Sequence, residues 1–166
     1  MITLISGTSR IGSNTQKVAL TYQKLLTEAN VQHNLLDLST HNVLLKNESF
    51  AEIENNYLIP AEKFIFIIPE YNGSYPGIVK LMIDHSRVAP CWNNKKALLT
   101  GVSTGRAGNL RGMEHLTGSL MHMKMSVHPN RLPISNVDKL LGDDQLISES
   151  NTLDAIKHQL AEFLKY

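Results

Sequence analysis

The sequence predicts an α/β fold in which helices cover both faces of a parallel sheet. Short apolar runs alternate with longer segments of helical periodicity through most of the 166 residues, and this alternation is typical of parallel β-α-β units. The run at 64–68 is continuously apolar, as expected of a strand buried on both faces. Three apolar runs end in polar, glycine-containing loops, which should meet at the carboxyl edge of the sheet, where ligands bind in such folds.

The amino-terminal segment predicts a strand, a helix and a second strand. The first strand covers 1–6, and a helix follows over 13–30, capped by Ser13 or Asn14. Apolar side chains recur along this helix at the spacing that places them on one face. The second strand is expected at 31–38, although its alternation of apolar and polar residues is only partial.

The middle of the chain predicts a loop and then a buried strand. Residues 40–61 mix polar and apolar types, and we expect a loop there with a short helix near 49–57. The third strand is the apolar run at 63–69. A helix should begin at Pro76, because proline suits the first helical turn, and run to about residue 88.

The remaining chain predicts two more strands and two more helices. The fourth strand is expected at 96–102, a helix at 109–123, the fifth strand at 124–127 or 124–128, and the last helix at 150–165. Five strands in this length fit the flavodoxin-like order 2-1-3-4-5. We therefore predict one three-layer domain over 1–166. Known proteins with this strand order bind flavin mononucleotide (FMN) at the switch between the first and third strands, and we use that arrangement only as a template.

Composition narrows the class of protein. Apolar residues make up 42% and charged residues 19% of the chain, as in ordinary globular proteins. The net charge of +1 argues against a nucleic-acid binder and against a strongly acidic electron carrier. Cys91 is the single cysteine, so no internal disulfide is possible, and with no apparent leader we expect a cytoplasmic setting. The apolar runs are too short to cross a membrane, and the histidine spacing predicts no metal site.

The first polar loop, SGTSRIGSNT at 6–15, has the chemistry of a phosphate site. Backbone amides at the start of a helix converge on an anion, and the helix dipole favours the negative charge. Hydroxyls and one guanidinium can add bonds. The candidate residues are Thr8, Ser9, Arg10, Ser13, Asn14 and Thr15. The alternative is a capped helix whose hydroxyls only satisfy its free amides. No lysine-containing phosphate loop and no GxGxxG pattern is present.

The second polar loop follows the third strand and suits a flat heterocycle. Tyr71 can stack on or flank a ring, Asn72 offers both a donor and an acceptor, and Gly73 allows close approach of the backbone. The alternative is a plain turn with Tyr71 at its rim. In the third loop, at 103–109, Gly105 and Gly108 permit a turn rich in amides, and Arg106 can meet an anion; a plain glycine-rich turn is the alternative.

These loops resemble those of the NADPH-dependent FMN reductase family, flavodoxin-like flavoproteins that include azoreductases and chromate or quinone reductases. PEYNGSYPGIVKLMIDH at 69–85 is similar to the family pattern PEYNxSxPGxLKNAIDW. GTSRIGSNT at 7–15 is similar to GSxRxxSxN, and 101–109 to GxSxGxxGG. Thr15, His85 and Asn109 depart from these patterns, and Asn109 replaces the second glycine of the third loop.

The resemblance implies that the first loop holds the FMN phosphate and that the other two border the isoalloxazine ring. The cofactor-binding set is Thr8, Ser9, Arg10, Ser13, Asn14, Thr15, Pro69, Glu70, Tyr71, Asn72, Gly73, Ser103, Thr104, Gly105, Arg106 and Gly108. It also implies a homodimer or homotetramer with the helix at 76–88 and its neighbours at the interface.

The implied activity is an NAD(P)H-dependent oxidoreductase. NADPH or NADH delivers hydride to FMN, and a small acceptor such as a quinone, an azo compound, a metal ion or free flavin then takes it. The cofactor carries this chemistry, so no side chain is singled out as catalytic. Two alternatives are a flavodoxin-type electron carrier without NAD(P)H turnover and a relative that has lost the flavin.

Overall fold

The apolar runs pair as the sequence predicts. The computed structural model describes residues 1–166, and its sheet has the order β2-β1-β3-β4-β5 with every pair parallel. The flavodoxin-like order predicted from the sequence is therefore confirmed. The five strands are β1 (Ile2–Ser6), β2 (His33–Asp37), β3 (Lys63–Pro69), β4 (Lys96–Val102) and β5 (Ser126–Val127).

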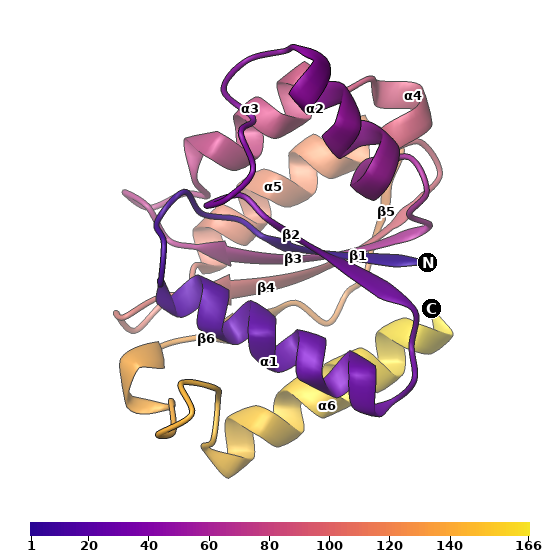
Figure 1. Cartoon of the computed structure of the whole chain (residues 1–166). Helices are drawn as coiled ribbons and strands as arrows, with labels where there is room; N and C mark the ends of the chain where they lie inside the picture. The colour runs from indigo at the N-terminus through magenta and orange to yellow at the C-terminus, as the bar shows by residue number, and fades with distance from the viewer.

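Helices cover both faces of this sheet and make three layers (Figure 1). On one face lie α1 (Asn14–Glu28) and α6 (Ser150–Lys165). The other face carries α2 (Glu48–Ile53), α3 (Gly77–His85), α4 (Val88–Cys91) and α5 (Leu110–His122). The expected short helix near 49–57 is α2 together with a π-helical turn, η1 (Glu54–Leu58). None of the helices combines the length and the apolar character that crossing a membrane requires.

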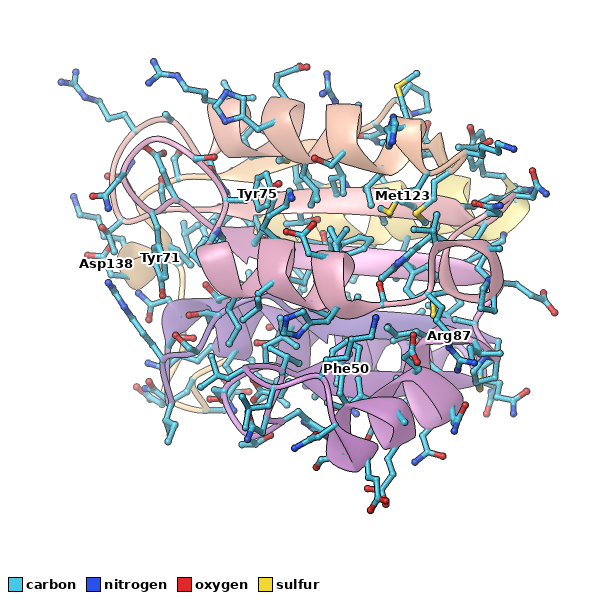
Figure 2. All side chains as sticks on the ribbon, turned by 90° about the horizontal axis from the view of Figure 1, so that it is seen from above. Phe50, Tyr71, Tyr75, Arg87, Met123 and Asp138 are labelled. Atoms are coloured by element: carbon cyan, nitrogen blue, oxygen red, sulfur yellow. The ribbon has the colours of Figure 1, made fainter.

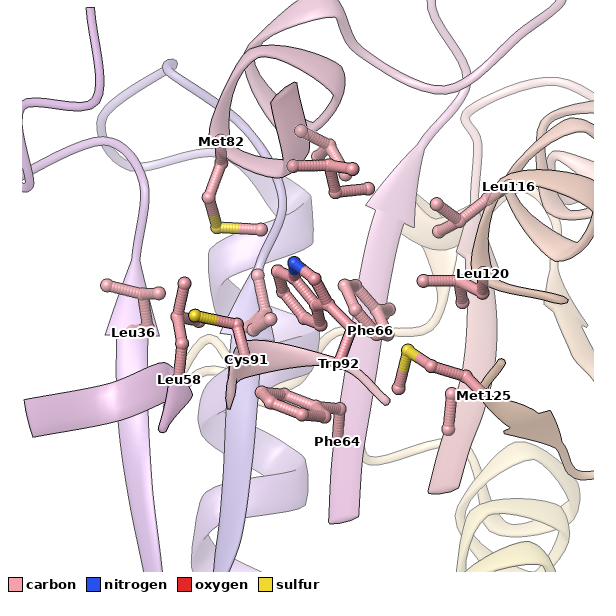
Figure 3. Packing of buried hydrophobic residues seen from close by; sticks show 14 of the residues in the cluster. Leu36, Leu58, Phe64, Phe66, Met82, Cys91, Trp92, Leu116, Leu120 and Met125 are labelled. Atoms are coloured by element: carbon pink, nitrogen blue, oxygen red, sulfur yellow. The ribbon is translucent and has the colours of Figure 1, made fainter. Parts of the chain in front are cut away.

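Each face of the sheet has its own apolar core. The core under α2 to α5 contains 23 buried residues and the core under α1 and α6 contains 16. Trp92 fills the centre of the first core, with its ring centroid 5.0 Å from that of Phe64 and 6.3 Å from that of Phe66 (Figure 3). Because alternate side chains of β3 enter the two cores, its residues 64–68 are all apolar.

The prediction of a strand at 124–127 or 124–128 is wrong in extent, because β5 begins only at Ser126. Lys124 has a left-handed backbone (φ 61°), and its amide and that of Met125 donate to carbonyls of α5. Both residues therefore end the helix instead of beginning the strand. The pairing then continues in two pieces, because β5 pairs with the start of β4 while β6 (Leu132–Ile134) pairs with its end. Pro129, which has no amide proton, lies between them.

The prediction of a helix at 76–88 is also wrong in extent, because α3 covers only Gly77–His85. Pro76 precedes the helix as its N-cap residue (ψ 143°), and α3 ends at His85. The amide of Arg87, which would continue the helix by donating to Ile83, instead donates to the buried carboxylate of Glu54 at 2.6 Å. Ser86 adopts an extended backbone (ψ 150°), and the chain restarts as α4. A contact between distant segments therefore breaks the helix.

Candidate functional site

Three loops meet where β1, β3 and β4 end, around a cavity of about 350 Å³. This volume lies within the range of about 300–1,000 Å³ that is usual for small-molecule sites. The structure thus brings together the three segments predicted to form one site. The cavity is lined by Arg10, Ile11, Gly12, Ser13, Asn14, Thr15, Pro69, Glu70, Tyr71, Val102, Ser103, Thr104 and Val137.

The first loop leads into α1 and leaves the helix start open to the cavity. The hydroxyl of Ser13 accepts from the amide of Gln16, which confirms Ser13 as the N-cap residue. The amides of Ser13, Asn14 and Thr15 form no hydrogen bond within the chain. Three adjacent free donors at the positive end of the helix dipole, in residues that line a cavity, suit an anion.

Thr8 and Arg10 connect the first loop to the second. Thr8 is buried, and its hydroxyl lies 2.5 Å from that of Tyr71 and accepts from the amide of Arg10. The Arg10 guanidinium lies over the Tyr71 ring, 4.2 Å from its centroid. Tyr71 therefore lies against the first loop, and it lines the same cavity as the residues with free helix amides.

The second loop contains a tight two-residue turn. Asn72 (φ 52°) and Gly73 (φ 77°) both have left-handed backbones, and the backbones of Tyr71 and Ser74 exchange hydrogen bonds across them. Asn-Gly is the usual pair for such a turn because both central residues need positive φ. Neither Asn72 nor Gly73 lines the cavity, and Asn72 is exposed. In this structure they shape the turn that holds Tyr71.

The third loop presents its backbone. The Ser103 hydroxyl donates to the carbonyl of Gly105 and accepts from the amide of Gly108, while the Ser103 amide donates to Ile134. The backbone amides at the two ends of the loop, those of Ser103 and Gly108, are therefore already hydrogen-bonded. The amides of residues 104–107 form no hydrogen bond within the chain. Ser103 and Thr104 line the cavity, whereas Gly105, Arg106 and Gly108 do not.

Asn109, the departure from the family pattern, is fully buried beneath the loops. Its side-chain amide donates to the carbonyls of Ile68 at 3.1 Å and Pro69 at 2.8 Å. It thereby joins the end of the third loop to the root of the second. Its backbone is left-handed (φ 59°), as a glycine at this position would readily be.

Sequence reasoning missed four residues of the cavity lining, namely Ile11, Gly12, Val102 and Val137. Val102 is the last residue of β4, so its place at the sheet edge could have been anticipated. Val137 begins a short 3₁₀ turn, η2 (Val137–Lys139). The sequence around it shows no periodic pattern from which this turn could be predicted. In Figure 2, Asp138 of this turn and Tyr71 lie at the same end of the molecule. Of the predicted residues, Thr8 and Ser9 also lie outside the lining.

Solved structures with the same architecture include a flavoenzyme and an azoreductase. The flavoenzyme NAD(P)H:acceptor oxidoreductase FerB from Paracoccus denitrificans matches with a TM-score of 0.77 over 96% of this chain and 93% of that one, at 22% identity. An azoreductase from Bacillus anthracis matches with a TM-score of 0.61 over 99% of both chains, at 15% identity. At these identities the likeness establishes the fold.

The family follows from a direct match to its model. Residues 1–139 match the model of NADPH-dependent FMN reductases, and the chain belongs to that oxidoreductase family. An NAD(P)H-dependent FMN reductase of Pseudomonas aeruginosa is 30% identical over 105 residues, which cover 60% of this chain and 56% of that protein. Another, from Schizosaccharomyces pombe, is 31% identical over 108 residues, which cover 62% and 51%. The chain thus spans about half the length of the curated relatives it matches.

Proposed function

We propose that this chain is an FMN-dependent NAD(P)H oxidoreductase that passes hydride from NAD(P)H through bound FMN to a small acceptor. The observation that carries the proposal is the cavity formed jointly by the three loops, with free helix amides and a guanidinium at one end. Because its lining extends from Arg10 to Val137, we also propose that 1–166 forms one FMN-binding domain.

The first loop fits the phosphate of FMN. The amides of Ser13, Asn14 and Thr15 are free, and Arg10 supplies a positive charge on the same stretch of lining. Ser13 already caps the helix, so its hydroxyl is engaged while its amide is available. This geometry supports phosphate binding more strongly than a plain capped helix, which would not line a cavity shared with two other loops.

The other two loops fit the ring of the flavin. Pro69 ends β3 and Glu70 follows it, and Val102 and Val137 add apolar surface to the cavity. The free amide of Thr104, which lines the cavity, offers a donor to carbonyl or ring-nitrogen acceptors of a heterocycle. Four of the thirteen lining residues are hydrophobic, so the cavity offers limited apolar surface beside convergent polar groups.

When bound, FMN would supply the hydride chemistry of the reaction. The residues of the chain bind and orient the cofactor, and none needs to act as a general acid or base for hydride transfer itself. For this reason we assign no catalytic residue. The acceptor class that we propose comprises quinones, azo compounds, metal ions and free flavin.

The resemblance also supports self-association, and we propose a homodimer or homotetramer through α3 and its neighbours. This side of the molecule carries a groove of about 550 Å³ between α3 and α5. Val88 at its edge and Met121 on α5 are large apolar residues left exposed, by 47% and 62%.

The test of the proposed activity is the visible spectrum of the purified chain after incubation with FMN and desalting, followed by anaerobic addition of NADPH or NADH. We expect the flavin absorption to be retained and then bleached by at least one nucleotide. The subsequent addition of each candidate acceptor, with the return of the absorption as the readout, identifies the acceptor class.

Two results would contradict the proposal. Flavin absorption that is retained but that neither nucleotide bleaches would indicate an electron carrier. A chain that neither retains FMN nor shows NAD(P)H oxidation when FMN is added in excess would indicate a relative without flavin. Riboflavin, which lacks the phosphate, serves as the matched control ligand for the first loop.

A further inference from the structure

We propose that Tyr71 belongs to the phosphate end of the site, and that its hydroxyl makes the site select phosphorylated flavin over riboflavin. This inference rests on the proposed function, because it takes FMN as the ligand. It differs from the expectation drawn from the sequence, in which Tyr71 stacks on or flanks the flat ring.

The contacts of Tyr71 connect it to the first loop. Its hydroxyl is 2.5 Å from that of Thr8, which also accepts from the amide of Arg10. Arg10 in turn lies over one face of the aromatic ring, at 4.2 Å. Tyr71 and Arg10 line the same cavity as the free amides of Ser13, Asn14 and Thr15. A hydroxyl, a guanidinium and helix amides are a donor set that suits a phosphate.

The backbone holds Tyr71 in this position. Hydrogen bonds in both directions join it to Ser74, with lengths of 2.9 and 3.1 Å, across the Asn72-Gly73 turn. The next amide before it, that of Glu70, donates to Val102 at 2.9 Å. Backbone hydrogen bonds thus fix the chain at Tyr71 and at the residue before it. The Tyr71 side chain then connects the second loop to the first.

The ring of Tyr71 is also less suited to act as a platform for the flavin. A stacking platform must offer an open aromatic face, and the guanidinium of Arg10 occupies one face of Tyr71. The apolar surface available to a flavin ring comes instead from Pro69, Val102 and Val137. The contacts with Thr8 and Arg10 therefore assign Tyr71 to the first loop, the part of the cavity that would hold the phosphate.

The test compares two ligands that differ only in the phosphate. Dissociation constants of FMN and riboflavin are measured by quenching of flavin fluorescence for the full chain and for Tyr71→Phe, which keeps the ring under Arg10 and removes only the hydroxyl. We expect the FMN dissociation constant to rise about tenfold, as for loss of a hydrogen bond to a charged group. The constant for riboflavin should change by less than about twofold.

Tyr75→Phe is the matched control. Tyr75 belongs to the same loop, but its hydroxyl faces Ser119 on α5 at 3.4 Å and lies outside the cavity. Neither flavin constant should change in this variant. Thermal unfolding of both variants verifies that the fold is retained.

Several outcomes would overturn the inference. Equal weakening of FMN and riboflavin in Tyr71→Phe would assign the residue to the flavin ring, and unchanged constants for both would leave its hydroxyl without a role. Equal affinity of the unaltered chain for the two flavins would remove the proposed selectivity. An unaltered chain that binds neither flavin would overturn the proposed function, and the assignment of Tyr71 with it.

Discussion

Asn109 links two loops of the site by contacts that a glycine at the same position could not make. Its side-chain amide donates to two carbonyls at the end of β3 and so joins the third loop to the root of the second. The fit is close, because the three atoms nearest to a β-carbon built on Gly112 all belong to the Asn109 side chain, with Oδ1 at only 2.1 Å. The residue pair is therefore sterically coupled.

We expect Gly112→Ala to destabilise the chain by about 2 kcal/mol, because the added methyl group displaces Asn109. Asn109→Gly should cost about 1–2 kcal/mol through the two lost hydrogen bonds. In the double variant, the methyl group meets no asparagine, and alanine favours the helix by about 1 kcal/mol over glycine. Urea unfolding of the four proteins measures the coupling free energy. Additive effects of the two substitutions would contradict this arrangement.

At the scale of elements, the carboxylate of Glu54 joins η1 to the start of α4. It is buried and accepts from the amide of Arg87 at 2.6 Å, from its guanidinium at 3.0 Å and from the thiol of Cys91 at 3.5 Å. Burial raises the pKa of Glu54, but these hydrogen bonds and the charge of Arg87 outweigh it and hold the pKa below its ordinary value. Burial, with the nearby Glu54 charge, raises the pKa of the Cys91 thiol to about 12.

The lowered pKa of Glu54 predicts a loss of stability in acid. A carboxyl group whose pKa is lower in the folded state stabilises the fold above its unfolded pKa, and this contribution is lost as the pH falls through the folded pKa. Glu54→Gln should therefore cost about 2 kcal/mol at pH near 7, and the difference from the unaltered chain should shrink below pH of about 4. Urea unfolding at several pH values measures it. A difference that is constant with pH would show that the charge of Glu54 contributes nothing.

At the scale of the whole molecule, a buried polar network attaches the last helix to the sheet. The Tyr22 hydroxyl of α1 donates to Oε1 of Gln159 on α6 at 2.6 Å, and Thr100 of β4 donates to the same atom at 3.1 Å. The Gln159 side-chain amide donates to the carbonyls of Leu99 and Asn130. Burial raises the pKa of Tyr22, so its phenol stays protonated. The network thus ties both helices of one layer, α1 and α6, to the central sheet.

We expect Gln159→Leu to lower the free energy of unfolding by about 2–4 kcal/mol, because it leaves several buried groups without partners. Thermal or urea unfolding measures the loss. Gln32→Leu is the matched control, since Gln32 is exposed and only its backbone carbonyl is engaged, and it should change stability by no more than about 0.5 kcal/mol. Equal effects of the two substitutions would contradict a structural role for the network.

Much of the fold and part of the candidate site could be predicted because the signals are local. A continuous apolar run predicted β3, and helical periodicity predicted α6, whose bounds match the expected 150–165. Ser13 preceded a helical pattern and caps that helix. Since the carboxyl ends of parallel strands meet at one edge, three polar loops after β1, β3 and β4 were expected to share a site, and they line one cavity.

The remaining features depend on residues that are distant in sequence and meet only in the folded chain. Glu54 captures the amide of Arg87 and breaks a helix whose own periodicity continues. Val137 reaches the cavity because β6 pairs with the end of β4, a register that no local pattern specifies. Tyr71 could serve either a ring or a phosphate by its chemistry, and its contact with Thr8, 63 residues away, places it against the first loop. Local periodicity determines which elements form, whereas hydrogen bonds between elements determine where they end and where their side chains point.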